Sequence, residues 1–375
     1  MRVLIAGDFV PRRRTAAQIE KGDYCCLDEV KPIIQAVDYA IVNFESPVVM
    51  REAKPIEKTG PSLRCTEKAM ECVAQAGFNC VTLANNHFRD YGQVGVEDTL
   101  KVCKKYKVDY VGGGKDIEEA ERILYKEIKG QRIAIINFCE NEWSIASEKY
   151  GGSAPLNLVK NYYFIQEAKK NADFVLIIIH GGVELYNFPS PRMKETYRFF
   201  VDSGADAVVN HHQHCYSGYE VYKDKPVFYG LGNFCFDKVQ AKEDKLREEG
   251  YMVEISFDKQ IGFSLIPYSQ CSESAPSVVL THDTSSFEMK MQQLNEIIKD
   301  DALLKRNFEK HALSGFVTAK EILSPYSSSF FKRLYSKGFL PSFVTKKRLN
   351  KMLANIQCES HKDILLLGLK HRLKI

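Results

Sequence analysis

Three histidines, His211, His212 and His214, lie within four consecutive positions of the segment VVNHHQHCYSG, although the whole chain contains only nine. The segment begins with a short apolar run, Ala207–Val209, that has the length of a buried strand. Because alternate residues of a strand point to the same face, His212 and His214 should face alike and His211 should face the other way. His212 and His214 are therefore the better candidates for shared chemistry, and His211 for a structural role.

Other polar residues occupy the same position relative to apolar runs of strand length. They are Asp8 after Val3–Ala6; Asn43 and Glu45 after Tyr39–Val42; Asn85, Asn86, His87 and Asp90 after Cys80–Ala84; and His180 and Glu184 after Phe174–Ile179. In open α/β sheets, binding sites form outside the carboxyl ends of the strands. Together with the histidine segment, these runs predict one site at that edge of the sheet.

The residue types at these strand ends indicate a metal centre. Neutral imidazole combined with carboxylate and amide oxygens suits Mn, Fe, Zn or Co. Two such ions about 3.5–4 Å apart can bind a water between them, lower its pKa and stabilise the oxyanion formed as it attacks. Taken singly, each residue has a structural alternative, such as a helix N-cap for Asp8, turns for Asn85 and Asn86, or a backbone-bonded core position for His180. Their shared position favours the metal centre.

The elements that must position these residues alternate along the chain. Apolar runs rich in Val and Ile, typical of strands buried on both faces, are separated by helix-like stretches, which predicts an α/β layered architecture. The helix-like stretches are Thr66–Ala76, Gly95–Tyr106, Asp116–Arg122, Asn161–Lys170 and Arg192–Ser203. Later segments, including a hairpin of Tyr219–Tyr222 and Val227–Tyr229, look antiparallel, so the sheets should be mixed. After residue 284 the pattern predicts only helices, at Phe287–Lys299, Asp301–His311 and Ala319–Leu323.

Composition and charge separate the two ends of the chain. Of 375 residues, the first 284 carry 35 Lys/Arg and 40 Asp/Glu, whereas residues 285–375 carry 17 and 8, a net charge of +9. The tail therefore has a different role or partner. The 11 cysteines include no CxxC pair and are expected to be reduced thiols. Neither a signal peptide nor an 18-residue apolar run is visible, so we expect a cytoplasmic protein with peripheral contact at the inner membrane face as the remaining option.

The polar segments resemble the CapA family of capsule-synthesis proteins linked to poly-γ-glutamate. The segments that carry the resemblance are IAGDFVP, VNFESPV, LANNHFRDYGQVG, IIIHGGVELYNFPSP and VVNHHQHCYSGYEVYKDKPVFYGLGNFCFD, spread over residues 4–237. The resemblance implies a metallophosphoesterase-like sandwich of mixed β-sheets flanked by helices over residues 1–270. Residues 285–375 take no part in it and form a basic, mainly helical C-terminal region.

The resemblance also assigns roles to single residues. It implies one or two divalent ions, with Asp8 on one metal, Glu45 bridging both, Asn86 and His180 on the second, and His212 and His214 completing the sites. His87 would stand near the leaving group, oriented by Asp90, with Glu184 facing the substrate. Asn233 would lie on the closing wall, and Lys58 and Arg64 are further predicted substrate-binding residues. Two departures stand out: the usual D-x-H reads Asp8-Phe9-Val10, which reduces the ligands of one metal, and Gln213 replaces the proline of HHPH, which should loosen that loop.

Two functional readings follow from this pattern. The first is a metal-dependent hydrolase acting on a phosphoester, or on an amide or ester bond, in a surface polymer or its precursor. The alternative is a non-catalytic factor that uses the metal site to hold a polymer or to stabilise the fold.

The basic tail has its own alternatives. Phe330, Phe331, Tyr335, Phe339 and Phe343 interleave with Lys and Arg, but no nucleic-acid motif is present, so no nucleic-acid partner is expected. With the leucine block DILLLGLKHRL at 363–373, the tail either contacts an anionic membrane or packs its leucines on the catalytic domain.

Overall fold

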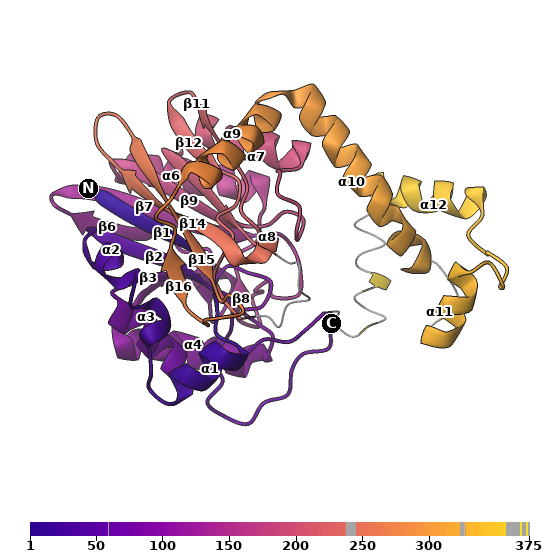
Figure 1. Cartoon of the computed structure of the whole chain (residues 1–375), viewed down its shortest axis with the longest axis horizontal. Helices are drawn as coiled ribbons and strands as arrows, with labels where there is room; N and C mark the ends of the chain where they lie inside the picture. The colour runs from indigo at the N-terminus through magenta and orange to yellow at the C-terminus, as the bar shows by residue number, and fades with distance from the viewer. Residues whose placement is uncertain are drawn as a thin grey trace. The chain divides into compact units, whose positions relative to one another are not determined.

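A computed structural model describes residues 1–58, 60–237, 245–322, 326, 328–357, 368–369 and 373. The chain divides into two units, Met1–Lys305 and Arg306–Ile375. The first unit contains two large β-sheets, a two-stranded sheet and the helices that cover the large sheets (Figure 1). The second contains α11 (Ser329–Ser336) and α12 (Lys346–Gln357). The helix α10 (Asp301–Ile322) runs from the first unit into the second as one element, where the sequence pattern predicted two separate helices.

The first sheet has eight strands and is mixed. Its order is β16-β15-β14-β1-β2-β3-β4, with β13 also pairing with β1. The strands are β1 (Arg2–Val10), β2 (Tyr39–Phe44), β3 (Cys80–Thr82), β4 (Asp109–Val111), β13 (Asn233–Phe236), β14 (Glu249–Ser256), β15 (Gly262–Gln270) and β16 (Val278–Leu280). β1 pairs in parallel with β2 and β13 and antiparallel with β14. The sequence pattern did not identify β4, β13 or β16 as strands.

The second sheet has six strands in the order β11-β12-β10-β9-β7-β6. They are β6 (Leu124–Ile128), β7 (Gln131–Cys139), β9 (Phe174–His180), β10 (Ala207–His211), β11 (Tyr219–Tyr222) and β12 (Lys225–Phe228). β7, β9, β10 and β12 run parallel, and β11 and β12 form the predicted hairpin. A small pair, β5 (Gly113–Gly114) and β8 (Gly152–Ser153), connects loops near the site.

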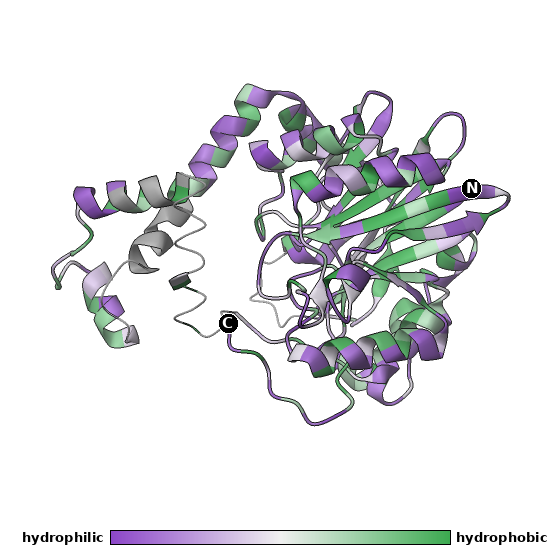
Figure 2. Ribbon diagram, turned by 180° about the vertical axis from the view of Figure 1, so that it is seen from behind, coloured by the Kyte–Doolittle hydropathy of each residue, from purple (hydrophilic) through white to green (hydrophobic). Residues whose placement is uncertain are grey.

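The two sheets pack face to face, because their strands are apolar on both sides. Alternate residues of the two sheets share one core: Val3, Ile5 and Ile41 meet Ile135, Leu176, Ile178 and Val209. The opposite faces lie in two further cores, which contain residues of helices. Along the strands the ribbon is largely hydrophobic (Figure 2). The predicted fold class, a layered sandwich of mixed sheets flanked by helices, is confirmed.

Helices cover each outer face of the sandwich. α3 (Glu67–Ala76) and α4 (Gly92–Tyr106) supply Met70, Val73 and Val96 to the core over the first sheet. α6 (Leu158–Asn171) and α7 (Pro191–Asp202) supply Ile165 and Phe200 to the core over the second. The shorter helices are α1 (Arg13–Glu20), α2 (Lys31–Gln35), α5 (Ile117–Ala120) and α8 (Lys245–Glu248).

Helix ends follow from local sequence. The Thr66 hydroxyl accepts a hydrogen bond from the Lys68 N–H at the start of α3, and the Ser190 hydroxyl accepts one from Met193 N–H at the start of α7.

α9 (Ser285–Lys299) belongs to the first unit. The sequence pattern had assigned these residues to the predicted C-terminal region, 285–375. Met291 and Leu294 are buried in the core between the sheets, and Ile298 in the core over the second sheet. Lys194 of α7 reinforces this packing, because its ammonium donates to the backbone carbonyl of Ile298 and pairs with Asp301 at 2.5 Å. The 1–270 and 285–375 division itself stays a prediction.

The apolar core between the two sheets determines where the strand ends lie. Replacing Ile178 by Ala, in the strand that ends at His180, should lower the free energy of unfolding by about 2–5 kcal/mol, because a fully buried side chain leaves a cavity. Urea unfolding followed by circular dichroism measures this. Val159→Ala on α6 is the control, since Val159 is 70% exposed and its loss should change the free energy by about 0.5 kcal/mol at most. Equal losses in both variants would contradict the packing described.

Candidate metal centre

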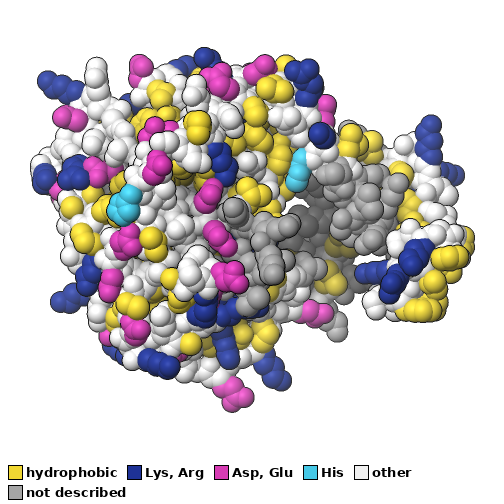
Figure 3. Space-filling view, in the orientation of Figure 1, with side chains coloured by type: hydrophobic (Ala, Val, Ile, Leu, Met, Phe, Trp, Pro, Cys, Tyr) yellow, Lys and Arg dark blue, Asp and Glu magenta, His cyan; other side chains and the backbone are white. Residues whose placement is uncertain are grey.

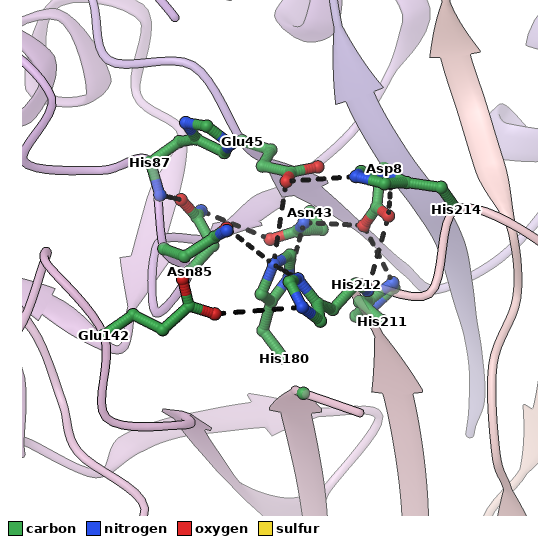
Figure 4. Close-up of polar contacts among 12 residues, drawn as sticks. Asp8, Asn43, Glu45, Asn85, His87, Glu142, His180, His211, His212 and His214 are labelled. Carbon is green, nitrogen blue, oxygen red and sulfur yellow. Dashed lines mark hydrogen bonds and ion pairs between the residues drawn. The ribbon is translucent and has the colours of Figure 1, made fainter. Parts of the chain in front are cut away.

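The carboxyl ends of the parallel strands in both sheets meet at one edge of the sandwich. β1, β2 and β3 of the first sheet deliver Asp8, Asn43, Glu45 and the Asn85–His87 turn, whereas β9 and β10 of the second deliver His180 and the three histidines 211, 212 and 214 (Figure 4). The residues that sequence analysis placed at strand ends therefore come from two sheets facing each other, and not from a single sheet edge.

Asp8 is turned into the site by irregular pairing of β1. The register of β1 shifts at Asp8 against both β2 and β13, and a bulge of this kind redirects side chains. At the preceding residue, Gly7, β1 approaches the backbone of Gly232 closely. Only glycine allows this close approach, since a Cβ at position 7 would lie 2.0 Å from the Gly232 carbonyl oxygen. The same approach sets Asp8 opposite Asn233 of β13.

The Asp8 carboxylate is fully buried and surrounded by donors. The Asn43 side-chain amide donates to its Oδ1 at 2.7 Å, and the Nδ1 atoms of His211 and His214 lie 3.5 Å from its oxygens. Burial alone would raise the pKa of Asp8, but the hydrogen bond with His214 and the nearby imidazoles of His211 and His180 bring it below its ordinary value.

Glu45 lies between two groups of candidate ligands. It follows β2, is fully buried, and its Oε1 is 3.6 Å from His180 Nε2 and 4.0 Å from His214 Nε2. One ligand group is Glu45, His180 and His212, and the other is Asp8, Glu45 and His214; within each, the ligand atoms lie within 4.8 Å of one another. Because Glu45 belongs to both, the arrangement suits two neighbouring cations that share one carboxylate.

The donor chemistry of these groups fits divalent cations. Each group combines carboxylate oxygen with imidazole nitrogen, which suits Mn, Fe or Zn. Burial lowers the pKa of His180 well below its ordinary value, with His212 adding to the effect, and burial likewise lowers the pKa of His212. Neutral imidazoles beside ionised carboxylates are the protonation states in which both kinds of side chain bind a metal. Asn86 Oδ1 lies 3.1 Å from His180 Nε2 and so borders the first group.

The orientation of the His212 and His214 side chains is set by left-handed backbone conformations, and not by the alternation of side chains along a strand. β10 ends at His211, and the two histidines at 212 and 214 have φ of 92° and 57°. Such angles are costly for residues with a Cβ and concentrate at functional sites.

Gln213 fixes the loop that holds these histidines. Its side-chain amide donates to the carbonyls of Tyr186 and Phe188 at 2.6 and 3.0 Å, and its backbone carbonyl accepts the N–H of Leu185 at 2.8 Å. The expectation that glutamine in place of proline loosens this loop is therefore wrong.

Two residues contact the ligands although sequence analysis gave them no role. Asn43 places its Nδ2 between Asp8 Oδ1 and His180 Nδ1, at 2.7 and 3.2 Å, and its side-chain Oδ1 accepts a hydrogen bond from the Thr82 hydroxyl. Its place in the strand-end pattern was a usable signal. Glu142, in the loop after β7, lies 3.8 Å from His212 Nε2, and nothing in its sequence context pointed to it.

His87, Asp90 and Lys58 form a second buried cluster next to the ligands. Asp90 Oδ2 lies 2.6 Å from His87 Nδ1 and accepts the Leu63 N–H, and its other oxygen pairs with the Lys58 ammonium. The Lys58 ammonium is also 3.2 Å from His87 Nδ1. Burial lowers the pKa of His87 and Asp90 opposes this shift. Asp90 thus contacts His87 and also holds the loop that carries Lys58 and Leu63.

Three further predicted residues lie in different surroundings. Asn233 is fully buried and its Oδ1 is 2.9 Å from His214 Nδ1, so it holds the ring of this candidate ligand in position. Glu184 is exposed, and it acts on the pKa of His212 only as a nearby charge. Arg64 is exposed too, with its guanidinium 5.6 Å from the centre of the Tyr91 ring.

The shared position of Glu45 predicts how metal content responds to substitution. Glu45→Gln should reduce the content of Mn or Zn at both positions, because it removes the charge common to both ligand groups, whereas His212→Ala should affect only one. Elemental analysis of protein dialysed against excess metal measures the stoichiometry. His282→Ala is the matched control, since its side chain is 86% exposed. If Glu45→Gln and His212→Ala lose the same amount of metal, Glu45 is not shared.

Comparison with known proteins agrees with this residue pattern. The family model described as "Bacterial capsule synthesis protein PGA_cap" matches residues 2–238. "Capsule biosynthesis protein CapA" of Bacillus anthracis is 35% identical over 243 residues, covering 62% of this chain and 59% of that protein. "PGA biosynthesis protein CapA" of Bacillus subtilis (strain 168) is 34% identical over 222 residues, covering 58% of each.

The chain thus spans less than two thirds of the length of these curated relatives. Among solved structures, a hypothetical protein from Thermus thermophilus aligns with a TM-score of 0.47 and 14% identity, over 72% of this chain and 99% of the other. With the family model matching the whole segment from β1 to the end of β13, the chain belongs to the family of bacterial capsule synthesis proteins.

Proposed function

We propose that this protein is a metal-dependent hydrolase that acts in the synthesis or processing of a capsule or similar surface polymer of the poly-γ-glutamate type. The observation that supports it most is the pair of ligand groups sharing Glu45, with the His87–Asp90 pair beside them. The names of the relatives, which speak of capsule and PGA biosynthesis, support the polymer context. Divalent ions held by Asp8, Glu45, Asn86, His180, His212 and His214 would supply Lewis-acid activation of water and of the attacked bond.

His87 is the residue best placed to move a proton in this reaction. Its Nδ1 faces Asp90, so the Nε2 atom is left for the substrate, and the short contact to Asp90 fixes the ring orientation. Lys58 holds the other oxygen of Asp90, which prevents that carboxylate from turning away. We propose that the imidazolium form of His87, which the hydrogen bond to Asp90 favours against the effect of burial, donates a proton or a hydrogen bond from Nε2 to the departing oxygen or nitrogen.

Arg12 is a candidate for binding an anionic part of the substrate. It follows the strand that carries Asp8, and its guanidinium lies 6.0 Å from the centre of the Phe236 ring. The Phe236 ring in turn meets the imidazole of His214 edge-on, with centroids 5.3 Å apart. Burial and the neighbouring Arg13 lower the pKa of Arg12, and no carboxylate among the described residues forms an ion pair with it.

Arg14 shows the contrasting case. Its guanidinium lies 2.7 Å from Asp237 Oδ1, and the hydrogen bond to that carboxylate raises its pKa. A half-buried guanidinium such as Arg12 gains most from an anion supplied by a ligand. Phosphate or γ-glutamyl carboxylate are anions of the right kind.

Replacement of His87 tests the hydrolase proposal. His87→Ala should lower turnover of bis(4-nitrophenyl) phosphate or of a γ-glutamyl substrate by about 10²- to 10⁴-fold, the usual contribution of a general acid. Metal content should stay unchanged, because His87 belongs to neither ligand group. His282→Ala should change neither quantity. Parallel loss of metal and activity would make His87 a ligand, and bound metal without turnover in the unaltered protein would favour the non-catalytic, polymer-holding alternative.

Replacement of Arg12 tests the substrate charge. Arg12→Met should raise KM for an anionic substrate by about 10- to 100-fold, since a hydrogen bond to a charged group contributes about 1.5–3 kcal/mol, and should change kcat less. Steady-state kinetics with the same substrates separates the two constants. Arg132→Met is the control, because Arg132 lies at the exposed start of β7. An unchanged KM in the Arg12 variant would show that this side chain does not bind the substrate.

A further inference from the structure

The second unit contains a segment of 30 residues, 328–357, with unusual charge. It carries seven basic residues and no Asp or Glu. The basic residues are Lys332, Arg333, Lys337, Lys346, Lys347, Arg348 and Lys351. They are placed on α11, on α12 and in the turn after α11. A purely solvated surface segment normally mixes both signs of charge, so this composition points to an anionic partner.

The same segment exposes large hydrophobic side chains. Phe330 and Phe339 are 65% and 73% exposed, and no residue of α11 is buried. Phe331, Phe343, Leu353 and Ile356 are about half exposed. Figure 3 shows hydrophobic and basic side chains next to each other on the part of the chain that contains α11 and α12. Exposed apolar side chains grouped in this way mark an interaction surface.

Internal contacts hold this surface in shape. The Tyr326 ring packs against Phe331, Tyr335 and Phe343, with centroids 6.5, 5.5 and 6.3 Å apart. The Tyr326 hydroxyl donates to the Pro341 carbonyl, and the Tyr335 hydroxyl lies 3.0 Å from the Ser342 hydroxyl. These contacts fix α11 to residues 341–343 and leave Phe330 of α11 and Phe339, which follows the helix, as the most exposed aromatic rings of the segment.

We propose that residues 328–357 bind the surface of an anionic lipid bilayer, independently of the hydrolytic activity proposed above. Phenylalanines can enter the boundary between headgroups and acyl chains while Lys and Arg contact the anionic headgroups, which is how interfacial amphipathic segments bind. No helix among the described residues is long and apolar enough to cross a bilayer, so the contact proposed is peripheral. Sequence-tolerant nucleic-acid binders instead arrange aromatic rings as stacking platforms along a basic groove, and this segment presents its rings on a helix and a turn.

Vesicle sedimentation of the full chain tests this proposal. The protein should pellet with phosphatidylcholine vesicles containing about a third phosphatidylglycerol, and should be released by salt because the attraction is screened. It should not pellet with pure phosphatidylcholine. Each basic residue near anionic headgroups strengthens binding about fivefold, so Lys346→Gln with Lys347→Gln should weaken it about 25-fold. Phe330→Ser with Phe339→Ser should weaken binding by more than about tenfold, because the apolar contribution is lost.

Matched substitutions in the first unit separate a specific surface from general exposure. Val159→Ser with Tyr163→Ser removes apolar side chains that are 70% and 66% exposed on α6, and Lys149→Gln with Lys170→Gln removes two exposed charges. Both pairs should leave vesicle binding unchanged, and all variants should keep the thermal unfolding midpoint and the metal content of the parent. Equal binding of parent and 328–357 variants would overturn the proposal. So would capture of single-stranded RNA, tested in parallel, without binding to vesicles.

Discussion

The burial of two carboxylates at one point is the constraint on which the rest of this structure depends. Asp8 and Glu45 are almost wholly removed from water, and an ionised carboxylate in that position costs several kcal/mol unless cations or donors compensate it. Asn43, His180, His211 and His214 supply part of the compensation. The buried histidines 180, 211 and 212 have lowered pKa values, so the neutral imidazoles offer lone pairs and little positive charge. Divalent cations bound at the two ligand groups that share Glu45, as proposed, would resolve this imbalance.

The sandwich is built to bring these groups together. Parallel strands end at the same edge of a sheet, and the apolar core between the sheets sets the two edges opposite each other. The backbone then departs from regular geometry where ligands are presented. β1 has a bulge at Asp8, and His212 and His214 have positive φ. These deviations cost free energy and survive because the flanking strands and the hydrogen bonds of Gln213 fix the loop ends.

A second buried charge cluster couples the candidate catalytic histidine to a loop. Asp90 contacts His87, Lys58 and the Leu63 N–H together, so the loop between β2 and α3 cannot move away without exposing a paired charge. The relatives' names speak of capsule and PGA biosynthesis, and the proposed membrane contact of residues 328–357 would place the proposed hydrolase at a bilayer surface.

The sequence by itself determined the fold class and most of the candidate ligands. Apolar runs without alternation predicted strands buried on both faces, and the polar residues at the ends of these runs predicted one site. Both predictions were possible because the two signals are local and repeat along the chain. β4 and β13 escaped prediction because their three and four residues pair only through neighbours distant in sequence. Tertiary structure alone decided that the candidate ligands come from two facing sheets and that positive φ values orient His212 and His214. It also decided that Glu142 joins the cluster while Glu184 and Arg64 remain exposed. Those outcomes depend on contacts between residues up to about two hundred positions apart, such as the contact of the His212 N–H with Asp8. A local sequence pattern does not predict how such a contact changes the conformation of a loop.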